Sequence, residues 1–228
     1  MYNDEMKTKT TVILLAGGRG TRMGQKTPKQ FLALGGKPLA LYSFELFCQM
    51  PRIGEIVVVC AKEYEHLFST PKKLLFARGG NERQDSVFNG LQMADSKADF
   101  ICIHDAARPF IDQETVEKVL DAAIERGAAA PGAPAINTIK ECDSAGIVVK
   151  TPARDHLFEI QTPQVLRRSI LEEGYELLRR ENRLFTDDVS IAEALGYMVK
   201  IVKNNRPNFK VTTPFDLQIA KLLCQTNI

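Results

Sequence analysis

Residues 11–24 read TVILLAGGRGTRMG, and TPKQ follows at residues 27–30. The first five residues are apolar and partly β-branched, which predicts a buried strand that ends at the glycines. Four glycines allow sharp turns and let backbone N–H groups face an anion. Arg19, Arg22 and Lys29 add positive charge to the same segment. We therefore expect a nucleoside triphosphate site at the carboxyl end of this strand.

Two well-known glycine motifs do not fit this segment. A P-loop has a lysine and then Ser or Thr directly after its last glycine, whereas Gly24 is followed by Gln25 and Lys26. In the dinucleotide motif G-x-G-x-x-G counted from Gly18, the third glycine position is Met23. The sequence therefore disfavours both a P-loop and an NAD site.

Apolar runs typical of strands alternate along the chain with segments of helical periodicity. The predicted strands cover residues 11–15, 56–60, 74–77, 100–104 and 198–202. The predicted helices cover residues 39–48, 86–93, 116–123, 170–178 and 215–223, the last with Thr213 as its N-cap. This alternation predicts an α/β fold with a Rossmann-like, mostly parallel sheet and flanking helices, as a single domain over residues 1–228.

Residues 135–156 interrupt this alternation. Residues 135–142 and 147–151 read as two strands joined by the turn D-S-A-G, which predicts a β-hairpin arm. The edges of a protruding hairpin are often covered by a second subunit, although a simple surface hairpin is equally compatible with the pattern.

Composition excludes several classes of protein. The chain has 228 residues, of which 44% are hydrophobic and 25% charged, and its net charge is only +2. The small net charge argues against a nucleic-acid binder, and no apolar run is long enough for a membrane span. The polar start of the chain does not resemble a secretory signal, so we expect a cytoplasmic protein.

Three further segments carry residues suited to phosphate chemistry. In FICIHDAARPF, residues 100–110, Asp105 ends an apolar strand and is a candidate ligand for Mg²⁺, the alternative being a cap paired with Arg108. In GGNERQDSV, residues 79–87, glycines permit close approach to a base or ribose, and Ser86 offers a hydroxyl. Lys210 lies in a strand-like run at residues 208–212, where it could join Arg22 and Lys29 around a phosphoryl group.

Together these stretches resemble the 2-C-methyl-D-erythritol 4-phosphate cytidylyltransferase family over about residues 11–220. The resemblance rests on AGGxGxRMG with PKQF, GGxERxxSVxxGL, HDAARPF, TPQ, TDD and FKVTTPFDL in that order. It implies attack by the 4-phosphate of methylerythritol on the α-phosphorus of CTP, with release of pyrophosphate. It also implies a requirement for Mg²⁺ or another divalent cation.

The resemblance assigns roles to individual residues. It implies catalytic roles for Arg22, Lys29 and Lys210, and metal binding by Asp105. It implies CTP binding by Ala16, Gly17, Gly18, Gly20, Gly80, Asn81, Ser86, Asp105 and Ala106. It implies binding of the sugar-alcohol phosphate by Arg108, Thr138, Arg154 and Thr162, some of them from the partner chain of a homodimer joined by the arm.

Two alternatives remain at this point. One is a cytidylyltransferase for ribitol 5-phosphate, which shares the opening loop and the arm, although S-V at residues 86–87 and T-D-D at residues 186–188 favour methylerythritol phosphate. The other is a non-catalytic nucleotide-binding protein on the same fold. The chain also departs from many relatives just before Lys210, where it has Arg206 and Pro207.

Overall fold

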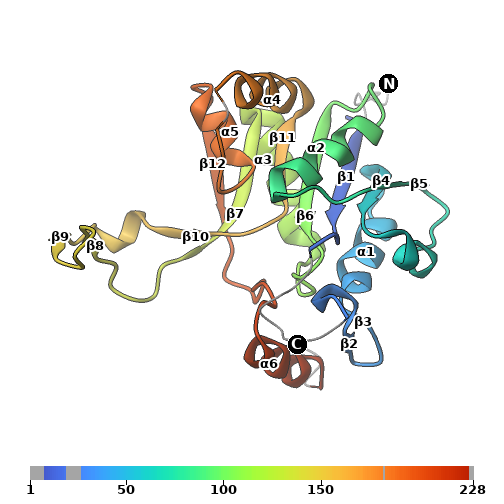
Figure 1. The fold of residues 1–228 in the computed structure, drawn as a ribbon, viewed down its shortest axis with the longest axis horizontal. Coiled ribbons are helices and arrows are strands. Elements are labelled where there is room, and N and C mark those ends of the chain that lie inside the picture. The colour runs from blue at the N-terminus through green and yellow to red at the C-terminus, as the bar shows by residue number, and fades with distance from the viewer. Residues whose placement is uncertain (1–7, 19–26, 182, 226–228) are drawn as a thin grey trace, which may run out of the picture.

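The computed structural model describes residues 8–18, 27–181 and 183–225. Within these residues an eight-stranded sheet lies between two layers of helices (Figure 1). The sheet contains β1 (Thr10–Leu15), β4 (Ile53–Val59), β5 (Lys73–Ala77), β6 (Phe100–Asp105), β7 (Ala128–Pro134), β10 (Phe158–Ile160), β11 (Gln164–Arg167) and β12 (Val199–Lys203). The helices are α1 (Ala40–Gln49), α2 (Arg83–Met93), α3 (Gln113–Arg126), α4 (Arg168–Glu181), α5 (Val189–Ala194) and α6 (Pro214–Gln225), with short 3-10 turns η2 (Lys29–Phe31), η3 (Lys62–Leu67) and η4 (Arg154–His156).

The sheet is mostly parallel, as the sequence predicts. Strands β5, β4, β1 and β6 are parallel neighbours in that order. Strand β11 is antiparallel to both β6 and β7, and β7 also pairs with β12 in parallel and with β10 in antiparallel fashion. The five strands predicted for the sheet and the five predicted helices are present with ends within three residues, whereas β7, β10, β11 and α5 were not predicted.

The central strand β1 is buried on both faces, which explains its continuous apolar sequence. Val12 and Leu14 belong to the cluster formed with α1 and α3, and Ile13 packs on the opposite face with residues of α2, α4 and α5. All three side chains are fully buried. This two-sided packing holds β1 rigidly, so the glycines that follow it leave the sheet at a fixed point.

The last helix, α6, closes the fold beside the small sheet of β2 (Ala33–Leu34) and β3 (Lys37–Pro38). The backbone N of Asp216 donates to Thr213 Oγ1 at 3.2 Å, which confirms the predicted N-cap. The Asp216 carboxylate in turn accepts from the backbone N of Thr212 and of Thr213, both at 2.8 Å. No helix in the described ranges has the length and apolar character needed to cross a membrane.

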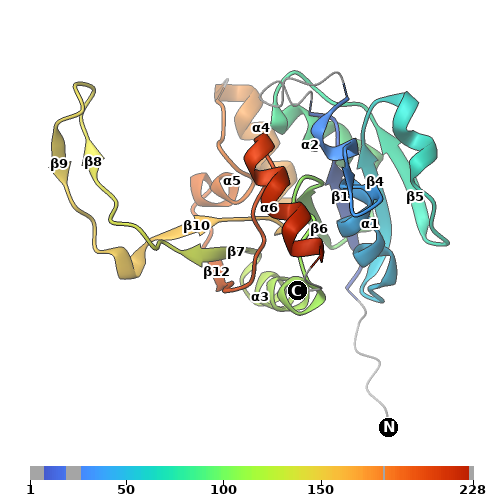
Figure 2. The same ribbon diagram turned by 90° about the horizontal axis from the view of Figure 1, so that it is seen from below.

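The predicted hairpin is present and projects from the body (Figures 1 and 2). Strand β7 leads into it and β10 returns from it, and at its tip β8 (Glu141–Cys142) pairs with β9 (Val148–Lys150). The Asp143 carboxylate caps the turn by accepting from the N of Ala145 and of Ile147. The first predicted arm strand is wrong over residues 135–140, where the structure assigns no strand.

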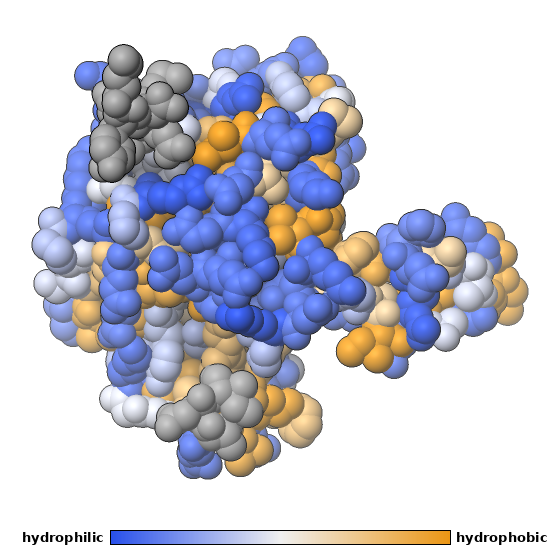
Figure 3. Space-filling model, turned by 180° about the vertical axis from the view of Figure 1, so that it is seen from behind, coloured by the Kyte–Doolittle hydropathy of each residue, from blue (hydrophilic) through white to orange (hydrophobic). Residues whose placement is uncertain are grey.

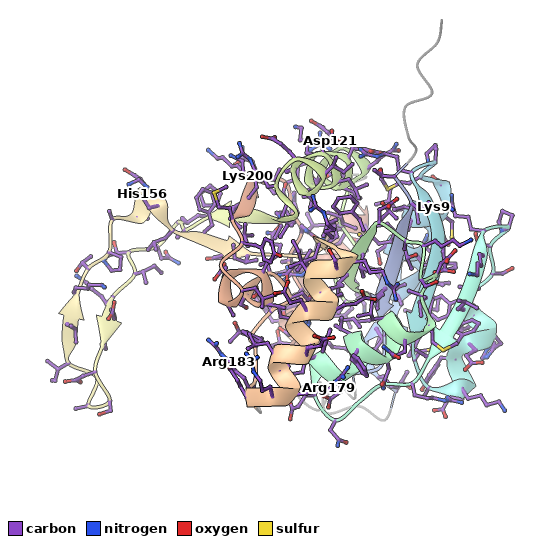
Figure 4. All side chains as sticks on the ribbon, turned by 90° about the horizontal axis from the view of Figure 1, so that it is seen from above. Lys9, Asp121, His156, Arg179, Arg183 and Lys200 are labelled. Carbon is purple, nitrogen blue, oxygen red and sulfur yellow. The ribbon has the colours of Figure 1, made fainter. Side chains whose placement is uncertain are left out.

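Apolar side chains are exposed along the arm. Ile136 is 81% exposed, and Ile147, Val148 and Val149 each exceed half. Figure 3 shows apolar patches on the arm beside a largely hydrophilic body, and Figure 4 shows His156 at the bend of the arm. Such a surface is unusual on a segment that projects from the body of its own chain.

Candidate active site

A cavity of about 500 Å³ opens where β1 and β6 end, beside the start of α2. Because parallel strands end at the same edge, Leu15 pairs with Asp105 and the segments that follow them lie together. The predicted site residues that line the cavity are Gly17, Gly18, Lys29, Gly80, Asn81, Ser86, Asp105 and Lys210. The lining residues that the sequence reasoning missed are Leu15, Gln30, Glu82, Arg83, Ala107 and Thr212.

The first glycine segment is held by its neighbours. The backbone N of Ala16 donates to the carbonyl of Val59 at 2.9 Å, which extends the pairing of β1 with β4. A Cβ at Gly17 would lie 3.2 Å from the Cα of Gly79, so the two glycine segments need the absence of side chains. The buried Gln30 donates through Nε2 to the carbonyls of Ala16 and Gly18, at 2.6 and 2.9 Å.

The second glycine segment is fixed by the start of α2. The backbone N of Gly80 donates to Ser86 Oγ at 3.0 Å, and the N of Glu82 donates to Asp85 Oδ2 at 2.9 Å. A Cβ at Gly80 would lie only 2.1 Å from the Cβ of Asp85, so no other residue fits there. The Ser86 hydroxyl therefore holds this loop as well as lining the cavity.

Asp105 is the charged centre of the cavity floor. Its carboxylate lies 2.8 Å from Lys210 Nζ and 3.3 Å from Arg83 Nε, and Arg108 Nε lies 3.8 Å away. Desolvation alone would raise the pKa of Asp105, but the charges of Arg83 and Lys210 hold that pKa well below its usual range. Asp105 is therefore ionised at neutral pH.

Arg83 is the main functional residue that sequence reasoning missed. Its guanidinium donates to both carboxylate oxygens of Asp188, at 2.9 and 2.7 Å, and also reaches Asp105. Burial works against this charge, but Asp188 and Asp105 raise the pKa of Arg83 and keep it cationic. Gln164 Oε1 accepts from the N of Asp188 at 2.7 Å, which places the T-P-Q and T-D-D motifs in one cluster. The signal available in the sequence was the position of Arg83 shortly after the second glycine segment.

Four predicted residues, Ala16, Ala106, Arg108 and Thr162, lie beside the cavity and not on its lining. Ala16 is buried next to Gly17. Ala106 is fully buried behind the cavity, and its neighbour Ala107 forms part of the wall. Arg108 donates through Nη1 to the carbonyl of Asn208 at 2.7 Å. The hydroxyl of the buried Thr162 is engaged with the N of Asp105 and with His104.

His104, one residue before Asp105, is wholly buried, and desolvation lowers its pKa to about 4. It is therefore a neutral imidazole at physiological pH. The segment at residues 208–212, predicted as strand-like, is not assigned as a strand, but the N of Val211 donates to the carbonyl of Ala107 at 2.8 Å. This bond holds the backbone next to Lys210 in a position where the Lys210 side chain lines the cavity.

The remaining predicted residues fall elsewhere. Thr138 and Arg154 are exposed on the arm, and Arg154 donates to the carbonyl of Ile136 at 2.9 Å. Gly20 and Arg22 lie outside the described residues. Arg206, which departs from many relatives, pairs with Asp112 and Glu114, and so does not enter the cavity lining.

The donor set at the cavity fits a metal that arrives with phosphates. Among residues 8–18, 27–181 and 183–225, no group of three or more His, Cys, Asp or Glu side chains could hold a metal ion. Mg²⁺ is commonly bound by one or two carboxylates together with substrate phosphates and water, without a complete protein cage. The ionised Asp105 fits the role of such a single protein ligand.

Comparison with known proteins gives a consistent result over almost the whole chain. Residues 10–226 match the family described as 2-C-methyl-D-erythritol 4-phosphate cytidylyltransferase. A chloroplastic protein of that name from Oryza sativa is 49% identical over 218 residues, which are 93% of this chain and 73% of the rice protein. The Chlamydia pneumoniae protein of that name is 40% identical, over 94% of this chain and 99% of its own length.

A solved structure supports the same relationship. The 4-diphosphocytidyl-2C-methyl-D-erythritol synthase of Anaerococcus prevotii superimposes with a TM-score of 0.86 at 26% identity. The alignment covers 96% of this chain and 99% of that one. The relationship therefore extends over almost the whole chain.

Proposed function

Because the chain belongs to the 2-C-methyl-D-erythritol 4-phosphate cytidylyltransferase family, we propose that it transfers the cytidylyl group of CTP to 2-C-methyl-D-erythritol 4-phosphate. In this reaction an oxygen of the 4-phosphate forms a bond to the α-phosphorus of CTP. The bond from that phosphorus to the β-phosphate oxygen breaks, and pyrophosphate leaves with the electron pair. The observation that carries the proposal is a cavity that combines two glycine segments with Lys29, Lys210 and Asp105.

The cavity suits a reaction that needs positioning and charge neutralisation. The attacking phosphate monoester is already anionic, so no strong base is required. In the proposed complex backbone N–H groups around Gly17 and Gly18 hold the triphosphate, as glycine segments at strand ends do, and Gly80 allows its close approach. Lys29 and, by family resemblance, Arg22 stabilise the charge that develops on the α-phosphate.

Asp105 would hold a divalent cation that comes with CTP. When bound, Mg²⁺ supplies charge neutralisation across the phosphate oxygens and orients the leaving group. Two neighbouring cations control Asp105. Arg83 and Lys210 keep its carboxylate ionised. Lys210 Nζ, at 2.8 Å, also limits how far the carboxylate can turn.

We further propose that the active unit is a homodimer formed through the arm at about residues 135–156. The support is that Ile136, Ile147 and Val149 are exposed on the arm, and that Thr138 and Arg154 lie on the arm and not on the cavity lining. In a two-fold dimer the arm of each subunit would bring Thr138 and Arg154 to the partner's cavity, where Arg108 completes the phosphate site. We also propose that residues 1–228 act as one nucleotidyltransferase domain and that the enzyme works in the cytoplasm.

Substrate choice is tested by measuring pyrophosphate release with each nucleoside triphosphate against both candidate acceptors. We expect turnover only with CTP and methylerythritol phosphate in the presence of Mg²⁺. Turnover only with CTP and ribitol 5-phosphate would overturn the acceptor, and no turnover with any pair would favour a nucleotide-binding protein without catalysis.

Subunit mixing tests the dimer. A Lys29→Met subunit lacks a cavity cation and an Arg154→Ala subunit lacks an arm cation, so each homodimer is expected to be nearly inactive. If the arms are exchanged, an equal mixture forms heterodimers with one complete site and recovers about a quarter of wild-type activity. A mixture as inactive as its components would refute a shared site.

A further inference from the structure

The buried side chain of His104 is not used by the proposed chemistry, yet both of its ring nitrogens are engaged. His104 precedes Asp105 on β6, is fully buried and does not line the cavity. Its ring meets that of Phe47 edge to face, with centroids 5.3 Å apart. A histidine placed in this way cannot touch a substrate, so any effect on the reaction must pass through its hydrogen bonds.

The hydrogen bonds determine which ring nitrogen carries the proton. Nε2 lies 3.2 Å from the backbone carbonyl oxygen of Arg108, and a carbonyl oxygen can only accept, so Nε2 must be the donor. A neutral imidazole has one N–H, so Nδ1 is an acceptor and receives the hydroxyl proton of Thr162 at 3.1 Å. The same hydroxyl oxygen accepts from the backbone N of Asp105 at 3.1 Å.

These bonds are part of a closed ring of hydrogen bonds that connects three separate segments of the chain. The N of Arg108 donates to the carbonyl of Asp105 at 2.9 Å and so closes the turn after β6. The side chain of Arg108 donates to the carbonyl of Asn208, and Asn208 Nδ2 donates to the carbonyl of Thr162 at 2.9 Å. His104 closes this ring of hydrogen bonds, because it bonds to both Thr162 and Arg108.

The ring carries the charged groups of the site. Asp105 and Arg108 are at the two ends of the turn, and Lys210 lies two residues after Asn208. If the turn relaxed, the Asp105 carboxylate and the Arg108 guanidinium would move relative to Lys210 Nζ, which is 2.8 Å from Asp105. A misplacement of about 1 Å can cost about a hundredfold in rate in reactions that depend on positioning.

We propose that His104 is a positioning residue whose hydrogen bonds to Arg108 and Thr162 lock the Asp105–Arg108 turn and so set the geometry of the acceptor-phosphate and metal side of the site. This inference rests on the proposed function, since it assumes that Asp105 and Arg108 act on phosphate and metal. It leaves the two glycine segments, which would hold CTP, outside the ring. The expected defect is therefore selective.

A pair of substitutions separates the two bonds of the ring. His104→Gln can still donate to the Arg108 carbonyl but loses the acceptor for Thr162, whereas His104→Asn keeps an acceptor near Thr162 and loses the donor. Both should lower kcat about ten- to a hundredfold and raise KM for methylerythritol phosphate. KM for CTP should rise by a clearly smaller factor, because CTP would meet this turn only through the cation held by Asp105. Thr162→Val should show the same selective defect, and Thr162→Ser should restore most of the activity.

The control is His66→Gln, at an exposed position of η3 away from the cavity, which should leave the kinetic constants unchanged. All rates are referred to the folded fraction, measured by circular dichroism. Variants that lose thermal stability but keep wild-type kcat and both KM values would overturn the proposal. So would a proportional rise of both KM values, because a general loosening of the site predicts that result.

A measurement on the wild-type protein does not depend on activity or on the variants folding. The ¹⁵N chemical shifts of the His104 ring, from a histidine-labelled sample, should identify a protonated Nε2 and an unprotonated Nδ1 at pH 7. An Nδ1–H tautomer or a doubly protonated ring would refute the assignment. If this tautomer is found but the wild-type enzyme transfers no cytidylyl group to any acceptor, the proposed function is wrong while the hydrogen-bond ring is confirmed.

Discussion

Replacement of Gly18 by alanine tests whether the first glycine segment holds the triphosphate. A Cβ at Gly18 would meet no atom of the described residues within 4 Å, and its φ is not in the left-handed region. The free energy of unfolding should therefore change by less than about 0.5 kcal/mol, which is a shift of roughly 2 °C or less in Tm for a chain of this size. The effect on the fold is negligible, so a change in kinetics must come from the ligand.

The expected kinetic change follows from the loss of one bond to a charged group. If a phosphate oxygen lies against the Gly18 backbone, the added methyl group prevents close approach and removes a hydrogen bond worth about 1.5 to 3 kcal/mol. Converted at about 1.4 kcal/mol per tenfold, KM for CTP should rise about ten- to 150-fold. KM for methylerythritol phosphate should stay within about twofold of wild type, because its proposed contacts lie elsewhere.

The assay is steady-state pyrophosphate release with each substrate varied, together with thermal unfolding with and without CTP. Gly54→Ala is a matched control, because a Cβ there also meets nothing within 4 Å and Gly54 lies near the start of β4, at the opposite end from the cavity. An unchanged KM for CTP in Gly18→Ala would show that the triphosphate does not lie against this segment, and the account of the cavity would have to be withdrawn.

Four other perturbations have defined outcomes. Lys29→Met should lower kcat about a hundred- to a thousandfold in the pyrophosphate assay, and a near-normal rate would remove Lys29 from the mechanism. Asp188→Asn removes the charged partner of Arg83 and should lower the free energy of unfolding by about 2 to 3 kcal/mol. The loss is smaller than for a fully buried pair because the Arg83 side chain is 30% exposed. Differential scanning calorimetry should show Tm reduced by about 4 to 12 °C, and an unchanged Tm would contradict the pairing. Ile147→Asp places a charge on the exposed arm and should shift the dimer to monomer in analytical ultracentrifugation, whereas a stable dimer would mean that the interface lies elsewhere. Desolvation would raise the pKa of Asp216, but hydrogen bonds from Thr212 and Thr213 lower it from 3.8 to about 2. Asp216 therefore stabilises the fold above pH 3.8, and this stabilisation is lost as the pH falls toward 2. Asp216→Asn should reduce the change with pH of the free energy of unfolding, measured by urea denaturation over that range, and a pH dependence equal to that of the wild type would contradict this role.

The parts of the fold that could be predicted are those whose side chains report their surroundings. Strand β1 is buried on both faces, so its apolar run identifies it without other information. Strand β7 was missed because Ala128–Pro134 contains only Ala, Pro and Gly, which favour no strand by themselves. Its neighbours β10, β11 and β12 hold it in the sheet, and tertiary pairing of that kind leaves no local signal.

The same limit applies to the site. Residues that follow strand ends or lie in glycine segments, such as Asp105 and Gly80, could be placed from the sequence because the fold class fixes where those segments meet. The Arg83 pairing with Asp188 joins residues 105 positions apart, and the role of Thr162 depends on a bond to the residue after His104. Pairings of that length need the coordinates, because no spacing in the sequence predicts them.

Oxygen labelling shows directly whether the acceptor's phosphate attacks the α-phosphorus of CTP. Methylerythritol phosphate with ¹⁸O in its phosphate oxygens is converted by the wild-type enzyme, and the products are examined by ³¹P NMR. We expect ¹⁸O in the oxygen that bridges the two phosphorus atoms of the cytidine diphosphate product, seen as an isotope shift on both resonances, with unlabelled pyrophosphate. Labelled pyrophosphate, or a product whose bridging oxygen comes from CTP, would contradict it.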